Sequence, residues 1–295
     1  MRGKLSEFTK VLIAVFLIGL SLLLYPTVSN YWNSKHSTRA INQYVKGLEN
    51  INAEEYERIW TEAADYNQEL TRRPDMFALP EYLEKRYFNT LNPDGSGVMG
   101  FIEIPKLEVS LPVYHGTSDS VLLRAVGHID WTSLPVGGPS THCVVSGHRG
   151  LPSAKLFTDL DKLREGDTFS LNILNEVLTY EVDQIRTVLP SDVMDLVISE
   201  GKDFCTMVTC TPYGINTHRL LVRGHRIETK VAEGRVVSEA VLIDQLIVAC
   251  VVAGPLILSL VLVIMVRKPE SVKKKKKERL LEKAIQENLK KDDRQ

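Results

Sequence analysis

Residues 204–227 read FCTMVTCTPYGINTHRLLVRGHRI. Residues 204–210 and 219–227 are rich in β-branched and apolar side chains, and Pro, Gly and Asn occur in the eight-residue stretch 211–218 between them. β-Branched residues favour strands, whereas a Pro-x-Gly sequence marks a turn. This stretch predicts two strands joined by a hairpin, which returns Arg219 to the strand end that carries Cys210.

Further short strands are predicted on the N-terminal side of this hairpin. Turn signals separate them at Pro105-Lys106, Gly137-Gly138-Pro139 and Gly166-Asp167. Many short strands without regular helices between them are typical of an all-β barrel or sandwich. A domain of about 130 residues is long enough for one hydrophobic core. We expect its strands at 98–104, 109–113, 142–146, 168–173, 177–188, 204–210 and 219–227.

The chain before this domain is predicted to be helical. Apolar residues recur at three- and four-residue steps from Ile41 to Ala63, until Pro74 and Pro80 interrupt the pattern. Such spacing is typical of amphipathic helices. The turn-forming cluster at residues 92–97 then marks a domain boundary. We therefore expect a helical segment at 33–96 and the β domain at 97–229.

Two stretches without charged side chains, residues 11–34 and 245–266, predict membrane spans. Each can provide the roughly 20 apolar residues that cross a bilayer as a helix. We expect transmembrane helices at 11–32 and 241–266. The alternatives are a cleaved signal peptide for the first stretch, which shows no Ala-x-Ala cleavage site, and a buried core helix for the second.

The charges indicate how these spans are oriented. The chain carries 36 basic and 37 acidic residues, but residues 267–295 alone carry twelve basic and six acidic ones. Basic residues flank membrane spans on the cytoplasmic side. Residues 1–10 and the basic tail at 267–295 are thus expected in the cytoplasm, where the tail attracts a lipid bilayer with anionic headgroups. The acidic remainder excludes nucleic acid as a general partner of the folded part.

Three residues are predicted to meet at one edge of the β domain. Cys210 closes a strand, His148 follows the strand at 142–146, and Arg219 opens the next strand. Cys143 and Cys205 lie within strands, where a packing role is expected. A thiol, an imidazole and a guanidinium at one edge suffice for acyl transfer without a cofactor, because they supply a nucleophile, a proton carrier and an oxyanion donor.

A metal site is the alternative for the same region. It would use Cys205, Cys210, His218 and His225. The spacing of these residues is unlike the paired-ligand patterns of structural zinc sites. We therefore predict no metal, and the order of His and Cys along the chain also excludes the papain pattern.

Two stretches resemble the sortase family, and most closely its class C, the pilin-polymerising sortases. They are LPVGGPSTHCVVSGHRGLPSAKLFTDLDKLREGD at 134–167 and TCTPYGINTHRLLVRGHRI at 209–227, within a similarity that covers residues 97–228. The resemblance implies a closed eight-stranded sortase β-barrel with short helices. It also implies that Cys210 is the nucleophile, and that His148 and Arg219 are the catalytic His and Arg.

The resemblance further implies the reaction and its partners. Sortases are transpeptidases outside the membrane of Gram-positive bacteria; they cut LPxTG-like sorting signals of surface proteins between Thr and Gly and pass the acyl group to an amine. In pilin sortases the amine is a lysine of the next pilin, and in housekeeping sortases it belongs to a cell-wall precursor. A span after the barrel favours the pilin class. A non-catalytic membrane assembly factor remains the non-enzymatic alternative.

A lid is the last expectation from the resemblance. Pilin sortases carry Asp-Pro-aromatic ahead of the barrel, and the matching sequence here is Pro74-Asp75-Met76-Phe77, with Met where Pro is usual. We expect Asp75 to pair with Arg219 and Phe77 to cover Cys210. An ordinary loop after a helix is the alternative.

Overall fold

The computed structural model describes residues 7–73, 75–229, 253–254, 256–257 and 278–283. The chain divides into a unit of residues 29–238 and a second unit that combines residues 1–28 with 239–295. The first unit contains the β domain. Most of the predicted second span at 241–266 and of the tail at 267–295 lies outside the described residues.

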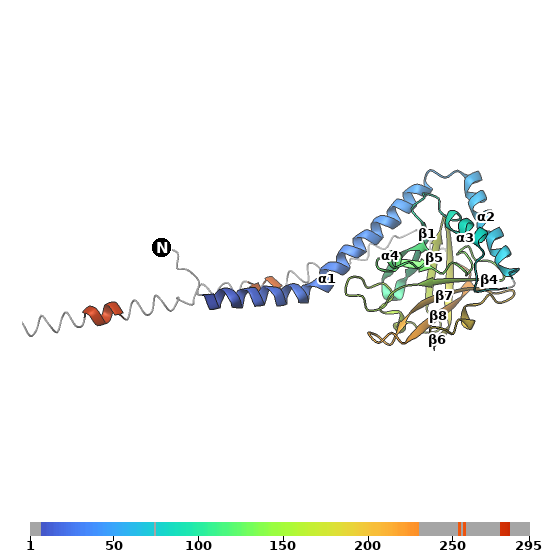
Figure 1. Ribbon diagram of the computed structural model, residues 1–295. Coiled ribbons are helices and arrows are strands. Elements are labelled where there is room, and N and C mark those ends of the chain that lie inside the picture. Colours follow the sequence, from blue (N-terminus) through green and yellow to red (C-terminus); the bar gives the residue numbers. More distant parts are fainter. Residues whose placement is uncertain (1–6, 74, 230–252, 255, 258–277, 284–295) are drawn as a thin grey trace, which may run out of the picture. The chain divides into compact units, whose positions relative to one another are not determined.

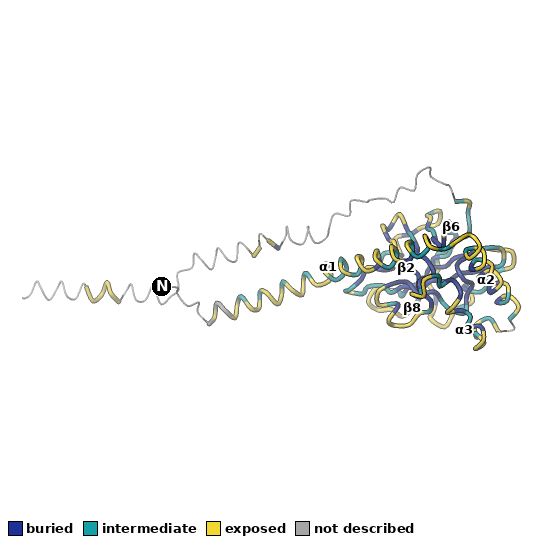
Figure 2. The backbone as a smooth tube through the Cα atoms, turned by 90° about the horizontal axis from the view of Figure 1, so that it is seen from above, coloured by how far each residue is buried: buried dark blue, intermediate teal, exposed yellow. Residues whose placement is uncertain are grey.

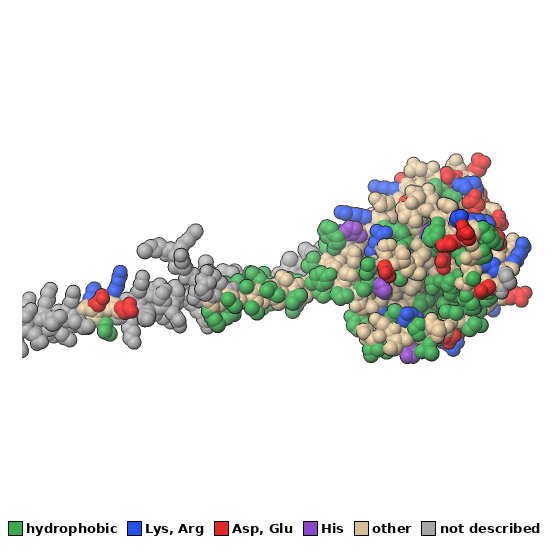
Figure 3. All heavy atoms as spheres, viewed as in Figure 1, with side chains coloured by type: hydrophobic (Ala, Val, Ile, Leu, Met, Phe, Trp, Pro, Cys, Tyr) green, Lys and Arg blue, Asp and Glu red, His purple; other side chains and the backbone are tan. Residues whose placement is uncertain are grey.

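The N-terminal helix α1 comprises residues Glu7–Leu48. Its stretch Val11–Leu48 has the length and composition of a membrane span, with a mean hydropathy of 2.5 in its most apolar window. Apolar side chains such as Val15 and Leu22 are exposed along it. Figure 2 shows much of this helix in the colour of exposed residues, and Figure 3 shows hydrophobic side chains along it. Among the described residues it is the one helix that meets these criteria, so the two-span arrangement stays a prediction.

Eight strands form a closed barrel in the order β1-β2-β3-β4-β7-β8-β6-β5 (Figure 1). The pairs β2–β3 and β4–β7 are parallel, and the other neighbours are antiparallel. The strands are β1 Val98–Ile104, β2 Val109–His115, β3 Val126–His128, β4 Thr141–Ser146, β5 Thr168–Ile173, β6 Glu176–Val188, β7 Asp203–Thr211 and β8 His218–Ile227.

This barrel confirms the predicted fold and corrects two details. β3 was not expected, because three residues give no alternating pattern. The predicted eight-residue loop at 211–218 is shorter, since Thr211 pairs with His218 and extends both strands of the hairpin.

Two apolar clusters lie on opposite faces of the barrel wall. The inner face of β4 and β7 contributes Cys143, Val145, Cys205 and Met207 to the main core. The six remaining strands also contribute residues to this core. The outer face carries a smaller cluster of Val144, Val188, Leu196, Val208 and Leu221. Successive side chains of a strand point to opposite faces, which explains why neighbours such as Met207 and Val208 belong to different clusters.

The helices that precede the barrel complete the main core. Helix α2 (Ala53–Thr71) is capped by Asn52, whose side chain accepts a hydrogen bond of 2.8 Å from the backbone of Glu55. Its buried face joins the core together with that of α3 (Glu81–Asn89), and Figure 1 shows both helices on one side of the barrel. The predicted helical region at 33–96 therefore comprises the end of α1, α2 and α3. Within residues 97–229 the short helices are η1 Pro105–Leu107, α4 Asp119–Leu122, η2 Leu160–Lys162 and η3 Met194–Leu196.

Candidate active site

The parallel pairing of β4 and β7 places His148 beside Cys210. Ser146 is the register partner of Val208, and the backbone N–H of Gly147 donates to Val208 O at 3.1 Å. The Thr209 hydroxyl returns a hydrogen bond of 2.7 Å to the carbonyl of Gly147. His148 and Cys210 follow these bonds directly, so the two residues leave the same end of the two strands.

The antiparallel pairing of β7 and β8 places Arg219 opposite Cys210, as direct register partners. The guanidinium of Arg219 donates to the carbonyl oxygens of Asn216 at 3.3 Å and His218 at 3.1 Å. These bonds to its own turn fix the direction of the side chain. The three predicted residues therefore come from adjacent strands at one end of the barrel.

The alternation along β7 and β8 decides which face carries the site. Cys210 shares the face of Val208, and Arg219 shares the face of Leu221, both of which belong to the outer apolar cluster. Cys210 and His148 are partly exposed. Cys210 and Arg219 thus lie on the outer face of the barrel wall, beside the outer apolar cluster, and not in the interior.

The loop that carries His148 is fixed by its backbone. The backbone N–H of Phe157 donates to His148 O at 3.2 Å. A methyl group added at Gly147 would lie 2.7 Å from the ring of Phe157, so this contact requires glycine. No hydrogen bond joins the His148 ring to the Cys210 sulfur in the part of the chain that the structure describes. Such pairs often tighten only when substrate binds.

Comparison with known proteins identifies this arrangement. The family model of the sortase domain matches residues 102–227. A crystal structure of sortase C1 from Streptococcus agalactiae is similar at 50% identity and a TM-score of 0.63, over 64% of this chain and 98% of that one. The chain belongs to the sortase family.

Two further relatives bear on the class of sortase. A Streptococcus pneumoniae sortase C, whose crystal structure addresses catalysis and pilin substrate specificity, matches at 40% identity and a TM-score of 0.57, over 64% of this chain and 97% of that one. Sortase A from Bacillus anthracis is 25% identical over 77% of this chain and 98% of its own length. The protein is therefore a cysteine transpeptidase whose structural neighbours are mostly class C sortases.

The predicted lid residues of this sortase lie over the outer face. The Phe77 ring packs edge-on against Trp131 with centroids 5.3 Å apart, and Trp131 in turn contacts the outer apolar cluster. Arg73 holds the segment by donating to the carbonyls of Ala78 at 3.0 Å and Trp131 at 2.9 Å. The segment that contains Phe77 is thus attached to the face that carries Cys210.

Asp75 does not form the predicted pair with Arg219. Its carboxylate accepts a hydrogen bond of 2.9 Å from the backbone of Phe77, whereas Arg219 is bound to the carbonyls of its own turn. An acceptor two residues before its donor is typical of an Asx turn, so Asp75 shapes the segment locally. The lid role of Asp75 and Phe77 stays a prediction.

The loop between β6 and β7 is attached to the outer face by His142. Its Nδ1 donates to the carbonyl of Val197 at 2.9 Å, and its Nε2 accepts from the hydroxyl of Thr206 at 2.7 Å. Burial lowers the pKa of His142 to about 4, so the ring is neutral near pH 7. An ion pair of 2.6 Å between Arg186 and Asp195 also holds the loop.

The residues of the alternative zinc site are not brought together. Cys205 is fully buried on the inner face of β7, whereas Cys210 lies on its outer face. Cys143 and Cys205 are direct register partners inside the barrel, where they pack as the sequence predicts.

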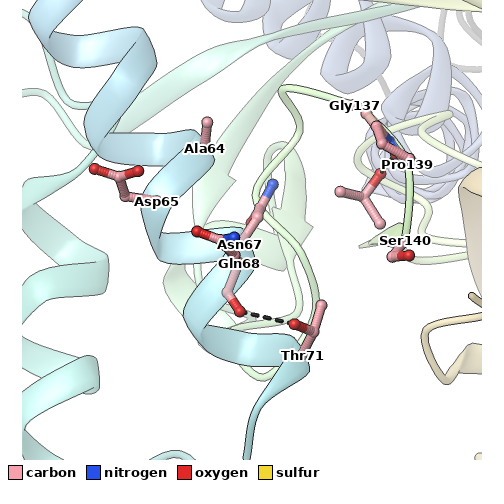
Figure 4. Close-up of a pocket in the computed structure, with 10 residues that line it drawn as sticks. Ala64, Asp65, Asn67, Gln68, Thr71, Gly137, Pro139 and Ser140 are labelled. Atoms are coloured by element: carbon pink, nitrogen blue, oxygen red, sulfur yellow. Dashed lines mark hydrogen bonds between the residues drawn. The ribbon is translucent and has the colours of Figure 1, made fainter. Parts of the chain in front are cut away.

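A cavity of about 460 Å³ lies away from the three predicted site residues, between α2 and the start of β4. Figure 4 shows Asp65, Asn67 and Gln68 on one wall and Gly137 to Ser140 on the other. The cavity adjoins Thr141, the first residue of β4, whereas His148 lies just beyond Ser146, the last residue of β4. Six residues of strand separate the two ends by about 20 Å. The cavity is therefore not part of the candidate active site.

Sequence reasoning missed one contact between the segment that carries His148 and the end of β7. Arg149, next to His148, donates to Thr211, next to Cys210. The position of Arg149 next to His148, in the stretch at residues 134–167, was the only sequence signal for this contact. Its binding partner depends on the parallel pairing of β4 with β7, and residue spacing does not reveal that pairing.

Proposed function

We propose that this protein is a membrane-anchored transpeptidase that cleaves an LPxTG-like sorting signal between Thr and Gly and transfers the acyl group to a pilin lysine. The observation that supports the proposal is the strand register, which pairs Cys210 with Arg219 and brings the end of β4, two residues before His148, to the same end of the barrel. The similarity to sortases of class C supports the pilin class.

The first half-reaction forms a thioester. The Cys210 thiolate attacks the carbonyl carbon of the signal's Thr, and the carbonyl oxygen takes up the negative charge. Arg219 donates hydrogen bonds to that oxygen, which stabilises the tetrahedral intermediate. When the Thr–Gly bond breaks, the His148 imidazolium gives its proton to the leaving nitrogen of Gly. The acyl group stays on the Cys210 sulfur.

The second half-reaction transfers the acyl group. The neutral amine of the acceptor lysine attacks the thioester carbon, and His148 accepts the proton that the amine loses. The carbon–sulfur bond then breaks and its electron pair returns to Cys210. An isopeptide bond has formed, and thiolate and imidazolium are restored. Every proton and electron pair comes from the chain and its two substrates, so the cycle requires no cofactor.

The outer apolar cluster supports a binding role for the surface beside Cys210. Val208 lies two residues before Cys210 on β7, Leu221 lies two residues after Arg219 on β8, and Val188 is the register partner of Arg219. This surface suits the apolar Leu and Pro of the sorting signal, because burying them removes apolar area from water. Phe77 and Asp75 then act as a lid that the signal displaces.

A competition between two acceptors tests the proposed function. The full-length protein in lipid nanodiscs is incubated with an LPxTG peptide, a lysine-bearing pilin domain and an oligoglycine that mimics the cell-wall precursor. We expect an isopeptide bond to the pilin lysine. Transfer to the oligoglycine alone would make the protein a housekeeping-type sortase, and no cleavage of the peptide would leave the non-catalytic assembly factor.

A further inference from the structure

Arg149 directly follows His148, and the hydroxyl that it binds belongs to Thr211, which directly follows Cys210. Its Nη1 donates to Thr211 Oγ1 at 3.1 Å, and the Arg149 side chain is only 8% exposed. This bond joins the two chain segments at the position next to each proposed reacting group. It therefore bears on how closely the thiol and the imidazole approach each other.

A second partner fixes the direction of the Arg149 side chain. Its Nη2 donates to Asp161 Oδ2 at 2.5 Å, from the short helix η2. A planar guanidinium held at both terminal nitrogens, Nη1 and Nη2, has little freedom to rotate. A lysine could not bind the two partners in the same way. Arg149 thus connects three segments, at 148–150, 160–162 and the end of β7.

The burial of Arg149 is costly for stability. Its Nε is buried without a hydrogen-bond partner among the described residues. Buried ion pairs recover their desolvation cost only partly, and apolar replacements are often neutral or stabilising. Fold stability alone is therefore a weak reason for an arginine at this position.

The next residue makes a second contact between the same two segments. Gly150 has a φ of +75°, and a methyl group added there would lie 2.9 Å from the ring of Tyr213, in the loop after Cys210. Arg149 and Gly150 therefore meet Thr211 and Tyr213, one polar contact beside one packed contact. The segment after the His is matched to the segment after the Cys over both positions.

We propose that Arg149 is a positioning residue of the transpeptidation, which holds the end of β7 that carries Cys210 against the segment that carries His148. The inference rests on the proposed function, because it concerns the distance between those two groups. Proton transfer needs an approach of about 3 Å. A displacement of about 1 Å can cost on the order of 100-fold in rate. Arg149 acts through Thr211 and contacts no reacting atom itself.

Three single variants and one double variant test this inference in the full-length protein with an LPxTG peptide. Arg149→Met is expected to lower kcat at least tenfold with KM nearly unchanged, and to change the pH profile of kcat/KM, because proton transfer between the thiol and the imidazole depends on how closely they approach each other. Arg149→Lys is expected to show most of the same decrease in kcat, because lysine cannot bind both partners of Arg149. Thr211→Val, which replaces only the hydroxyl, is expected to lower kcat severalfold.

The double variant separates a shared contact from two independent defects. If Arg149 acts through Thr211, Arg149→Met combined with Thr211→Val is no slower than Arg149→Met alone. Arg223→Met is the matched control, because Arg223 makes two bonds of 3.0 Å to Asp183 away from the site. It is expected to lower the unfolding temperature while kcat and the pH profile stay those of the wild type.

Three outcomes decide the matter. If the wild type forms a thioester on Cys210 while folded Arg149→Met keeps kcat and the pH profile, Arg149 has no positioning role. Should Arg149→Met not fold, a Thr211→Val variant with wild-type kcat contradicts the inference equally. If Cys210→Ala still cleaves the peptide, the proposed function fails instead, whatever the Arg149 variants do.

Discussion

Cys205 and Cys210 lie on the same strand, but they face opposite sides of the barrel wall. Cys205 is fully buried, pairs in register with Cys143 and belongs to the main core. Cys210 is partly exposed, pairs with Arg219 and lies beside the outer apolar cluster. One strand thus presents the same residue type once to the core and once to solvent, and the face decides its role.

The inner thiol lacks the properties of a nucleophile. Burial raises the pKa of Cys205 well above its ordinary value, and the neighbouring Cys143 adds to the effect. A protonated thiol without access to solvent reacts slowly. The comparison assigns packing to the inner face of β7 and chemistry to the outer face, and the variants below test that division.

Exchange of each cysteine for alanine should give opposite results. Cys210→Ala is expected to lose roughly 10⁴-fold or more of the cleavage rate, because the nucleophile is gone, with an unchanged unfolding temperature. Cys205→Ala is expected to keep activity but to lose about 1–2 kcal/mol of stability, because it leaves a small cavity. Peptide cleavage and thermal unfolding measure both effects. Cleavage by Cys210→Ala at the wild-type rate would end the division.

Two arginines of β8 extend the comparison. Arg219→Lys is expected to lower kcat about 100-fold, because lysine lacks the planar fork of donors for the oxyanion. Arg223→Lys is the matched change away from the site; it weakens the bonds to Asp183 and the stacking over Phe204, so stability falls while kcat is kept. Steady-state kinetics of the two variants decide the point. Near-normal turnover of Arg219→Lys would remove Arg219 from the mechanism.

Acid should loosen the outer face through His142. Because its pKa is lowered to about 4 in the folded protein, the unfolded chain binds more protons between pH 6.5 and pH 4. The stability contributed by the neutral ring is complete above about pH 6.5 and is lost as the pH falls to about 4, on the order of 3 kcal/mol.

Denaturant unfolding across this pH range measures the effect of His142. His142→Gln is expected to flatten the dependence, because a glutamine cannot gain a proton and can still donate to Val197. An equally steep loss of stability in that variant would assign the acid sensitivity to another group.

The smallest effect is expected for the lid. Asp75→Ala removes the acceptor that shapes the turn at Phe77. The segment should open more often, and Cys210 should be alkylated several times faster, about three- to tenfold. Glu81→Ala, an exposed position whose carboxylate binds Lys85, is the control. Equal labelling rates in the two variants would reject the lid interpretation.

Much of the barrel could be predicted from the sequence because its strands carry their own signals. The hairpin at 204–227 shows two β-rich runs around a Pro-x-Gly turn, and the structure has both strands. β3 was missed because its three residues, Val126–His128, depend on neighbouring strands for their conformation. Short strands are specified by tertiary pairing more than by local preference.

The residues of the site could be named, but its geometry could not be predicted. The positions of Cys210 and His148 at strand ends are visible in the sequence, whereas the parallel pairing that makes them neighbours is a property of the whole barrel. The expected pair of Asp75 with Arg219 shows the same limit. Each side chain has a closer partner, the backbone of Phe77 and the carbonyls after β7, which only the folded turns provide.

The most direct test of the central claim is to locate the covalent intermediate. The protein is incubated with an LPxTG peptide without an amine acceptor, digested at low pH and mapped by mass spectrometry. We predict the peptide up to Thr on the fragment that contains Cys210, released by hydroxylamine as a thioester should be, and formed far more slowly in His148→Ala and Arg219→Lys. A thioester on Cys143 or Cys205, or an undiminished adduct in both variants, would contradict the account.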